Sequence, residues 1–174
     1  IKGAIDADSA VVQQYPFNGG ANQIWKLVKD KEGTYRIYTK LGSKTRVLDV
    51  KRLGTTDGTP IQIYTPNDSD GQRFILEYAG GDAYRIVPKH APHMALAPTG
   101  GSQGNSIPVV LKTKNTAAKD QLWYFEDPGV MTSEAPKAGE TFHIRNRMSG
   151  KNFDVNLALT ADNTPLLQGI HNGR

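Results

Sequence analysis

The chain has 174 residues, a net charge of +4 and no cysteine, so it has no disulfide, thiolate nucleophile or cysteine-based zinc site. Its basic residues are scattered, as in KDKE at 29–32, and do not form the clustered stripe typical of nucleic-acid-binding proteins, so we expect no nucleic-acid partner. No apolar run approaches the roughly 20 residues that span a bilayer, so we also expect no membrane insertion.

Short alternating apolar and polar runs recur along the chain between clusters of Gly, Pro, Asn and Asp. No window sustains the 3.6-residue period of an amphipathic helix, so the pattern predicts an all-β protein with many turns. After an opening stretch, AIDAD at 4–8, the predicted strands cover residues 10–16, 22–28, 34–40, 45–51, 60–66, 72–78, 83–89, 93–98, 108–114, 121–127, 141–147, 151–156 and 164–172.

An internal repeat organises these strands. A step of 49 residues leads from Trp25 to Phe74 and again from Phe74 to Trp123. Each aromatic follows a glutamine by two positions, and the same step relates Val12 to Ile61, Tyr15 to Tyr64, Asn18 to Asn67 and Tyr35 to Tyr84. A fixed period of this length indicates a supersecondary unit copied in tandem.

The copies are unequal at the two ends of the chain. Residues 1–127 hold three copies, and the first of them lacks the strand that corresponds to 34–40. Residues 128–140 are interpreted as a linker. Residues 141–174 are interpreted as a partial fourth copy. An unpaired sheet edge is a liability. Either residues 141–147 return to close the same barrel, or they begin a second domain. Because the first copy starts in mid-repeat, we expect the chain to be part of a longer protein.

Three copies of about 49 residues, each with four short strands and a closing Q-x-W-type signature, resemble the ricin B-chain type of β-trefoil lectin, also called the family 13 carbohydrate-binding module. The resemblance covers residues 1–127 and, more weakly, 141–174. It implies a β-trefoil with three four-stranded repeats: a closed six-stranded barrel, capped by three hairpins, with pseudo-threefold symmetry and up to one sugar pocket in each lobe.

The repeated aromatics are expected to fill the barrel interior, because a closed barrel needs bulky apolar side chains there. For Gln23, Gln72 and Gln121, we expect buried amides that bond loop backbone, since glutamine offers both a donor and an acceptor. The resemblance adds a second possible place for these amides, at the edge of a sugar pocket.

A sugar pocket needs a carboxylate for vicinal hydroxyls, an aromatic face for the apolar side of the ring, and amides. The resemblance places such a set in the central lobe: Asp49, Gln62, Tyr64, Asn67 and Gln72. One departure is Gly71, where the family usually has Asn, which puts one supporting hydrogen bond in doubt.

The other two lobes differ from this pattern. In the lobe of residues 81–127, Ala97, Val110 and Lys112 replace the acid, the amide and the ring, so we predict no sugar there. The first lobe keeps the amides and the ring but has no carboxylate of its own: Gln13, Tyr15, Asn18, Asn22 and Gln23. Asp154 completes this set if the tail closes the barrel; in a second domain it would instead pair with Ile170 and Asn172.

No arrangement of residues in the sequence indicates catalysis, and we expect no catalytic residue, metal site or cofactor. The leading hypothesis is a lectin module for galactose-type or related glycans of glycoproteins, glycolipids or polysaccharides, with multivalency or oligomerisation raising avidity. Its expected setting is secreted or extracellular, as a targeting part of a toxin, hemagglutinin or glycosidase. The alternative is a β-trefoil protein-interaction or protease-inhibitor module.

Overall fold

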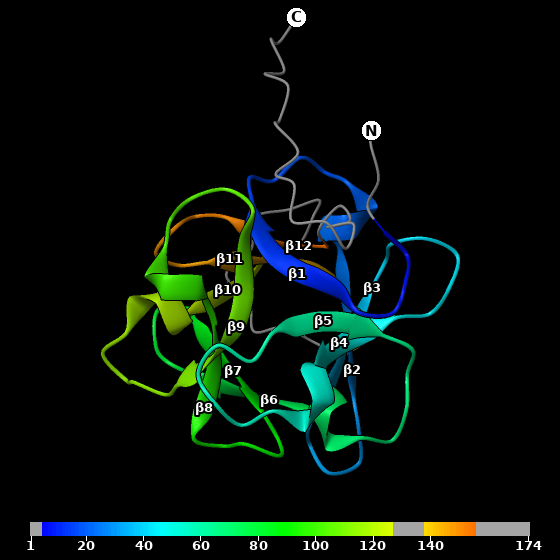
Figure 1. Ribbon diagram of the computed structural model, residues 1–174, viewed down its shortest axis with the longest axis horizontal. Helices are drawn as coiled ribbons and strands as arrows, with labels where there is room; N and C mark the ends of the chain where they lie inside the picture. Colours follow the sequence, from blue (N-terminus) through cyan, green and yellow to red (C-terminus); the bar gives the residue numbers. More distant parts are fainter. Residues whose placement is uncertain (1–4, 127–137, 156–174) are drawn as a thin grey trace, which may run out of the picture.

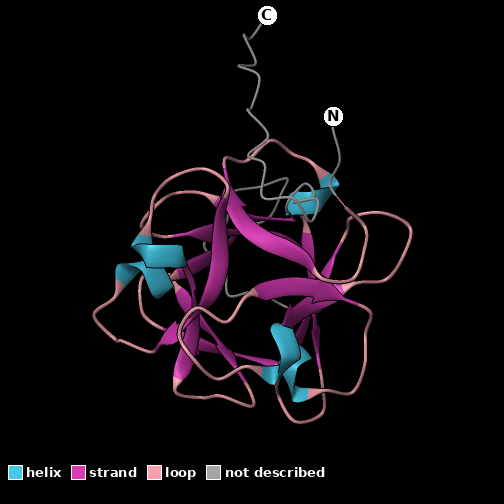
Figure 2. Cartoon of the chain, viewed as in Figure 1, coloured by secondary structure: helices cyan, strands magenta, loops and turns pink. Residues whose placement is uncertain are grey.

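The computed structural model describes residues 5–126 and 138–155 and is built almost entirely from β-strands (Figures 1 and 2). The strands of this part of the chain are β1 (Ala10–Tyr15), β2 (Trp25–Lys29), β3 (Tyr35–Thr39), β4 (Val47–Val50), β5 (Ile61–Tyr64), β6 (Phe74–Tyr78), β7 (Tyr84–Pro88), β8 (Met94–Pro98), β9 (Ile107–Thr113), β10 (Trp123–Glu126), β11 (Thr141–Asn146) and β12 (Asn152–Val155).

Six of these strands close into a ring. Antiparallel pairing runs from β2 to β3, β6, β7, β10, β11 and back to β2, so no edge is left open in this layer. The remaining strands form three two-stranded pairs, β4 with β5, β8 with β9, and β12 with β1. This arrangement is the predicted β-trefoil, with its barrel, three caps and pseudo-threefold symmetry.

Strands β11 and β12 belong to the same sheet as the strands of residues 5–126. β11 pairs with β2 and β10, and β12 lies alongside β1 (Figure 1). In the β1–β12 pair, Gln13 faces Asp154. Strands β11 and β12 occupy the places that β3 and β4 hold in the central repeat. The expected strand at 164–172, with Ile170 and Asn172, and most of the expected linker lie outside the described residues. The opening stretch forms no strand over residues 5–9, which make a bend and a turn.

The three repeated aromatics fill the interior, as the repeat predicts. Trp25, Phe74 and Trp123 have no exposed surface, and Phe153 of β12 is buried with them. The Phe153 ring lies edge-on to Trp123, with 4.3 Å between the ring centroids, and edge-on to Trp25 at 6.1 Å. The end of the described chain therefore packs into the same core as its beginning.

The repeated glutamines each end a short 3-10 helix: η1 (Ala21–Gln23), η3 (Asp70–Gln72) and η5 (Lys119–Gln121). Figure 2 shows the helices gathered at three places around the strands. Each buried amide donates to a backbone carbonyl, at Pro16, Thr65 or Thr113, and accepts from a backbone amide, at Asn18, Asn67 or Asn115. The expected bonding of loop backbone by these glutamines is confirmed. No helix within the described residues has the length and apolar character needed to cross a membrane.

Candidate functional site

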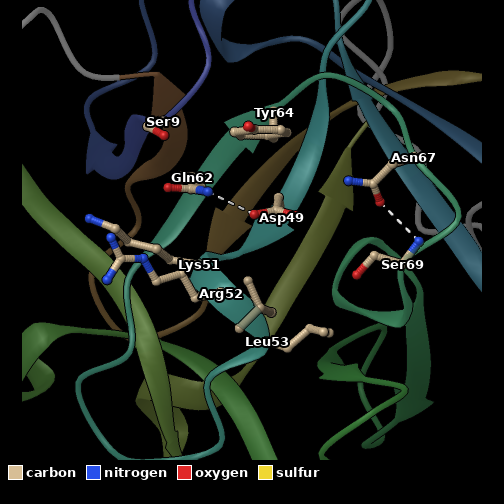
Figure 3. Close-up of a pocket in the computed structure, with 10 residues that line it drawn as sticks. Ser9, Asp49, Lys51, Arg52, Leu53, Gln62, Tyr64, Asn67 and Ser69 are labelled. Carbon is tan, nitrogen blue, oxygen red and sulfur yellow. Dashed lines mark hydrogen bonds between the residues drawn. The ribbon is translucent and has the colours of Figure 1, made fainter.

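A pocket of about 590 Å³ opens beside the β4–β5 pair of the central lobe (Figure 3). It is lined by Ser9, Asp49, Val50, Lys51, Arg52, Leu53, Gln62, Tyr64, Asn67 and Ser69. Four of the five residues predicted for this lobe therefore line one hollow, and the fifth, Gln72, is buried and donates a hydrogen bond to Asp49.

Asp49 is the carboxylate of this pocket, and two glutamine amides hold it in place. It faces Gln62 across the β4–β5 pair; Gln62 Nε2 donates to Oδ1 at 2.8 Å, and Gln72 Nε2 donates to Oδ2 at 3.2 Å. Burial raises the pKa of Asp49 above its usual range, against the lowering effect of these two hydrogen bonds. The two amides leave further lone pairs on the carboxylate available to a ligand hydroxyl.

Tyr64 and Asn67 line the pocket beside this carboxylate (Figure 3). Tyr64 follows Gln62 by two positions on β5, so both side chains lie on the same face of the strand. Asn67 Oδ1 accepts from Ser69 N at 2.9 Å, which leaves its Nδ2 on the side of Tyr64 and Asp49 (Figure 3). The hollow thus combines an acceptor, donors and a ring, which is the composition of a small polar-ligand site.

The first lobe repeats this geometry with residues from both ends of the described chain. Gln13 Nε2 donates to Asp154 Oδ2 at 2.8 Å, and Asn22 Nδ2 donates to Asp154 Oδ1. Burial raises the pKa of Asp154 to about 6, opposed by the hydrogen bond from Gln13. The structure therefore brings Asp154 to the amides of the first lobe.

The other predicted residues of this lobe lie nearby on the same segment. Tyr15 follows Gln13 by two positions on β1 and faces Asn152 across the β1–β12 pair. Asn18 Oδ1 accepts from Gly20 N at 2.9 Å, as Asn67 does in the central lobe with Ser69.

The two carboxylates differ in the amide on their second oxygen. In the first lobe, that donor is Asn22, whereas the central lobe has Gly71 at this position. A side chain on Gly71 would meet Leu53, whose Cδ2 lies 3.1 Å from the place of a Cβ. Leu53 thus occupies space beside Gly71, and Gln72 supplies the second bond to Asp49 instead.

The third lobe has no carboxylate at the position of Asp49 and Asp154. Ala97 faces Val110 across the β8–β9 pair, so an apolar contact replaces the acid and the amide. Lys112, at the position of Tyr64, forms an ion pair with Asp120, with 3.1 Å between Nζ and Oδ2. A hollow of about 490 Å³ remains beside Lys112, Asn115 and Gln121; its lining holds the carboxylate of Asp57 but no aromatic ring, and no carboxylate at the position of Asp49.

Sequence reasoning missed the loop that forms one wall of the central pocket. This loop is the 3-10 helix η2 (Lys51–Leu53), and Ser9 lies on the rim with it. The available signal is the contrast between KRL at 51–53 and TGG at 99–101, the matching loop of the third lobe. Within the described residues, no group of three or more His, Asp or Glu side chains is arranged to hold a metal ion.

Comparison with known proteins agrees with this geometry. A family model described as ricin-type beta-trefoil lectin domain-like matches residues 1–64, 42–112 and 70–169. Flavastacin from Elizabethkingia meningoseptica is 33% identical over 111 residues, which are 64% of this chain and 25% of Flavastacin. The chain thus spans no more than about a quarter of that relative's length.

Two solved structures share the fold. The designed 3-fold symmetric protein ThreeFoil superposes with a TM-score of 0.65 at 29% identity, over 70% of this chain and 84% of ThreeFoil. A mosquitocidal holotoxin superposes with a TM-score of 0.62 at 16% identity, over 86% of this chain and 23% of the toxin. The family match covers most of the chain and the barrel and caps agree with it, so the chain belongs to the ricin-type β-trefoil lectin domain-like family, whose fold is that of a carbohydrate-binding module.

Proposed function

We propose that this chain is a non-catalytic lectin module that binds galactose-type or related saccharides in two pockets, built around Asp49 and Asp154. The observation that carries the proposal is the shared geometry of the two carboxylates. Each is buried, each faces a glutamine that donates to it at 2.8 Å, and each has a tyrosine two positions beyond that glutamine.

This geometry suits a sugar ring. A fixed carboxylate accepts hydrogen bonds from two neighbouring hydroxyls, and charge-assisted bonds of this kind are about twice as strong as neutral ones. An aromatic ring covers the apolar face of the sugar, while the amides of Asn67 or Asn22 add polar contacts. The proposal gives the third lobe no saccharide, because Ala97 and Lys112 offer neither the acceptor nor the ring.

The proposal includes a setting for the module. We infer that it works outside the cell as a targeting part of a larger secreted protein, such as a toxin, a hemagglutinin or a glycosidase. Its partners are glycans of glycoproteins, glycolipids or polysaccharides. Two pockets on one chain favour multivalent contact, which raises the overall affinity above that of either site. We also assign β11 and β12 to the first lobe, which makes residues up to 155 part of one trefoil.

Titration calorimetry with methyl β-galactoside and a glycan array test this function. We expect Asp49→Ala and Asp154→Ala each to remove one site, and the double variant to bind no saccharide. Asp68→Ala is the matched control, because that carboxylate lies in the Asn67–Ser69 turn with 98% of its side chain exposed. Binding to a protein partner that free sugar does not compete, with no glycan bound, would overturn the lectin assignment in favour of a protein-interaction module.

A further inference from the structure

Two cationic side chains line the central pocket on one side. Lys51 and Arg52 belong to η2, and their charged ends lie next to one another on the Gln62 side, across the pocket from Asn67 and Ser69 (Figure 3). Both residues are exposed. The pocket lining therefore holds two positive groups and a single carboxylate, that of Asp49.

In the part of the chain that the structure describes, neither cation is neutralised by a neighbour. Within the described residues, the side chains of Lys51 and Arg52 form no ion pair and no hydrogen bond. Some other basic side chains are paired, as Lys112 is with Asp120, Lys114 with Glu77 and Arg36 with Asp68, so the two pocket cations are free in a way that these are not. The donors of Lys51 and Arg52 thus stay available at the pocket mouth.

The backbone that carries these side chains is strained. Arg52 has a φ of 55° and Leu53 a φ of 54°, a region that favours glycine. The matching loop of the third lobe reaches the same conformation with Gly100 and Gly101, at φ values of 64° and 63°. The central lobe therefore keeps side chains where glycine would hold the same backbone more easily.

This strain is concentrated at the pocket. Among the described residues, five that are not glycine have a positive φ, and three of them, Ser9, Arg52 and Leu53, line the pocket. Backbone strain of this kind gathers at ligand-binding sites, where the side chain it presents has a use. The comparison therefore points to Arg52 as a ligand contact.

We propose that the central pocket selects a saccharide with an anionic substituent, either a carboxylate or a sulfate, held between Lys51 and Arg52. The inference rests on the proposed saccharide-binding function, whose ring contacts are Asp49, Gln62 and Tyr64. Arginine presents a planar fork of donors that matches two oxygens of a carboxylate or sulfate, and lysine adds a point charge. The third lobe, with Thr99, Gly100 and Gly101 in this loop, lacks both cations.

The experiment compares ligands of equal ring structure on the full chain with the first-lobe site removed by Asp154→Ala. Calorimetry measures the dissociation constants of galactose, galacturonate and galactose 6-sulfate. Because both cations are exposed, we expect one or both anionic sugars to bind roughly fivefold to tenfold tighter than galactose at low salt. This preference should shrink as ionic strength rises. Whichever of galacturonate and galactose 6-sulfate binds more tightly identifies the substituent as a carboxylate or a sulfate.

Two variants decide the role of the cations. Lys51→Thr/Arg52→Gly copies the first two residues of the third-lobe loop and relieves the strained φ of Arg52, so it should fold normally. It should bring the ratio of galactose to anion dissociation constants to about one. Lys31→Thr/Lys40→Thr removes the same charge from exposed positions outside the pocket and should keep the wild-type ratio.

The outcomes separate the two levels of the proposal. Equal affinity for all three sugars, or a preference that Lys51→Thr/Arg52→Gly leaves unchanged, overturns anion selection while saccharide binding stands. If none of the three sugars binds, the saccharide-binding function of this pocket fails, and anion selection fails with it.

Discussion

Gln13 Nε2 donates to Asp154 Oδ2 at 2.8 Å across 141 residues of chain, and Gln62 Nε2 donates to Asp49 Oδ1 at the same distance across 13. One geometry is therefore built twice, once from a local hairpin and once from the two ends of the described chain. The closure of the barrel by β11 and β12 is what brings Asp154 to Gln13.

The two pockets should act independently. In a Tyr64→Ala variant, which removes the central ring, the remaining saccharide binding should come from the first lobe and disappear when Asp154→Ala is added. Calorimetry on the single and double variants checks this. The account fails if Asp154→Ala leaves the binding by Tyr64→Ala unchanged.

First-lobe binding should depend on pH. Burial raises the pKa of Asp154 to about 6, so the ionised acceptor is lost as the pH falls through that value. At pH 5, one unit below this pKa, only about a tenth of the carboxyl is ionised, whereas at pH 7 most of it is. In an Asp49→Ala background, we therefore expect the affinity for galactoside to be about tenfold weaker at pH 5 than at pH 7. A flat profile between pH 5 and 7 would argue against Asp154 as the acceptor.

The same ionisation affects stability with the opposite sign. The native pKa of Asp154 lies above its unfolded value, so the native state binds the proton more tightly. The stabilisation of the native state by this bound proton is fully present below about pH 4 and is lost as the pH rises through 6. We expect the free energy of unfolding of wild type to fall by about 2–3 kcal/mol over this range relative to Asp154→Asn. Urea titrations of both proteins at pH 4 and 7 measure the difference, which vanishes if Asp154 ionises normally.

Phe153 should be essential to the fold although it lies near the end of the described chain. Its ring contacts both Trp25 and Trp123 in the core, and it is fully buried. We expect Phe153→Ala to lower the free energy of unfolding by about 3–5 kcal/mol, and Phe153→Leu to have a smaller effect. If thermal and chemical denaturation show the Ala variant to be as stable as wild type, β12 is not part of the core.

The central pocket should bind galactoside more tightly when Gly71 is replaced by the asparagine that the first lobe has at this position, Asn22. Gly71→Asn alone must displace Leu53, whose Cδ2 lies 3.1 Å from the new Cβ, whereas Leu53→Gly opens that space as Gly101 does in the third lobe. The pair Gly71→Asn/Leu53→Gly should place an amide beside Asp49, with one N–H on the carboxylate and the second free to donate to the saccharide. We expect galactoside to bind several-fold tighter, at about 1 kcal/mol for the added hydrogen bond. Calorimetry in the Asp154→Ala background measures this. A well-folded pair that binds more weakly than the unmodified pocket would contradict the assigned place of this amide.

The sequence predicts the fold because its strongest signals are local and repeated. The 49-residue step from Trp25 to Phe74 to Trp123 predicts the aromatic residues of the core. The glutamine before each of these aromatics hydrogen-bonds the corresponding loop backbone in its lobe. Hydrophobic alternation sets each strand, so eight strands of the second and third copies lie within the segments expected for them, except that β9 begins one residue earlier.

Features that depend on long-range register or on loop conformation were harder to predict. The pairing of Gln13 with Asp154 requires β12 to lie beside β1, and the sequence pattern alone leaves two placements of the tail open. The wall formed by Lys51 and Arg52 depends on positive φ values that no local signal predicts for arginine. The turn at residues 5–9 is held by tertiary contacts, among them the bond from Thr65 N to Asp8 Oδ1 at 2.7 Å.

The central claim is that the carboxylates of Asp49 and Asp154 each anchor one saccharide. A crystal of this chain soaked with a galactoside tests it most directly. The account predicts sugar density at both carboxylates, with vicinal hydroxyls on their oxygens, and none beside Ala97. Saccharide bound in the third lobe, with both carboxylate pockets empty, would contradict it.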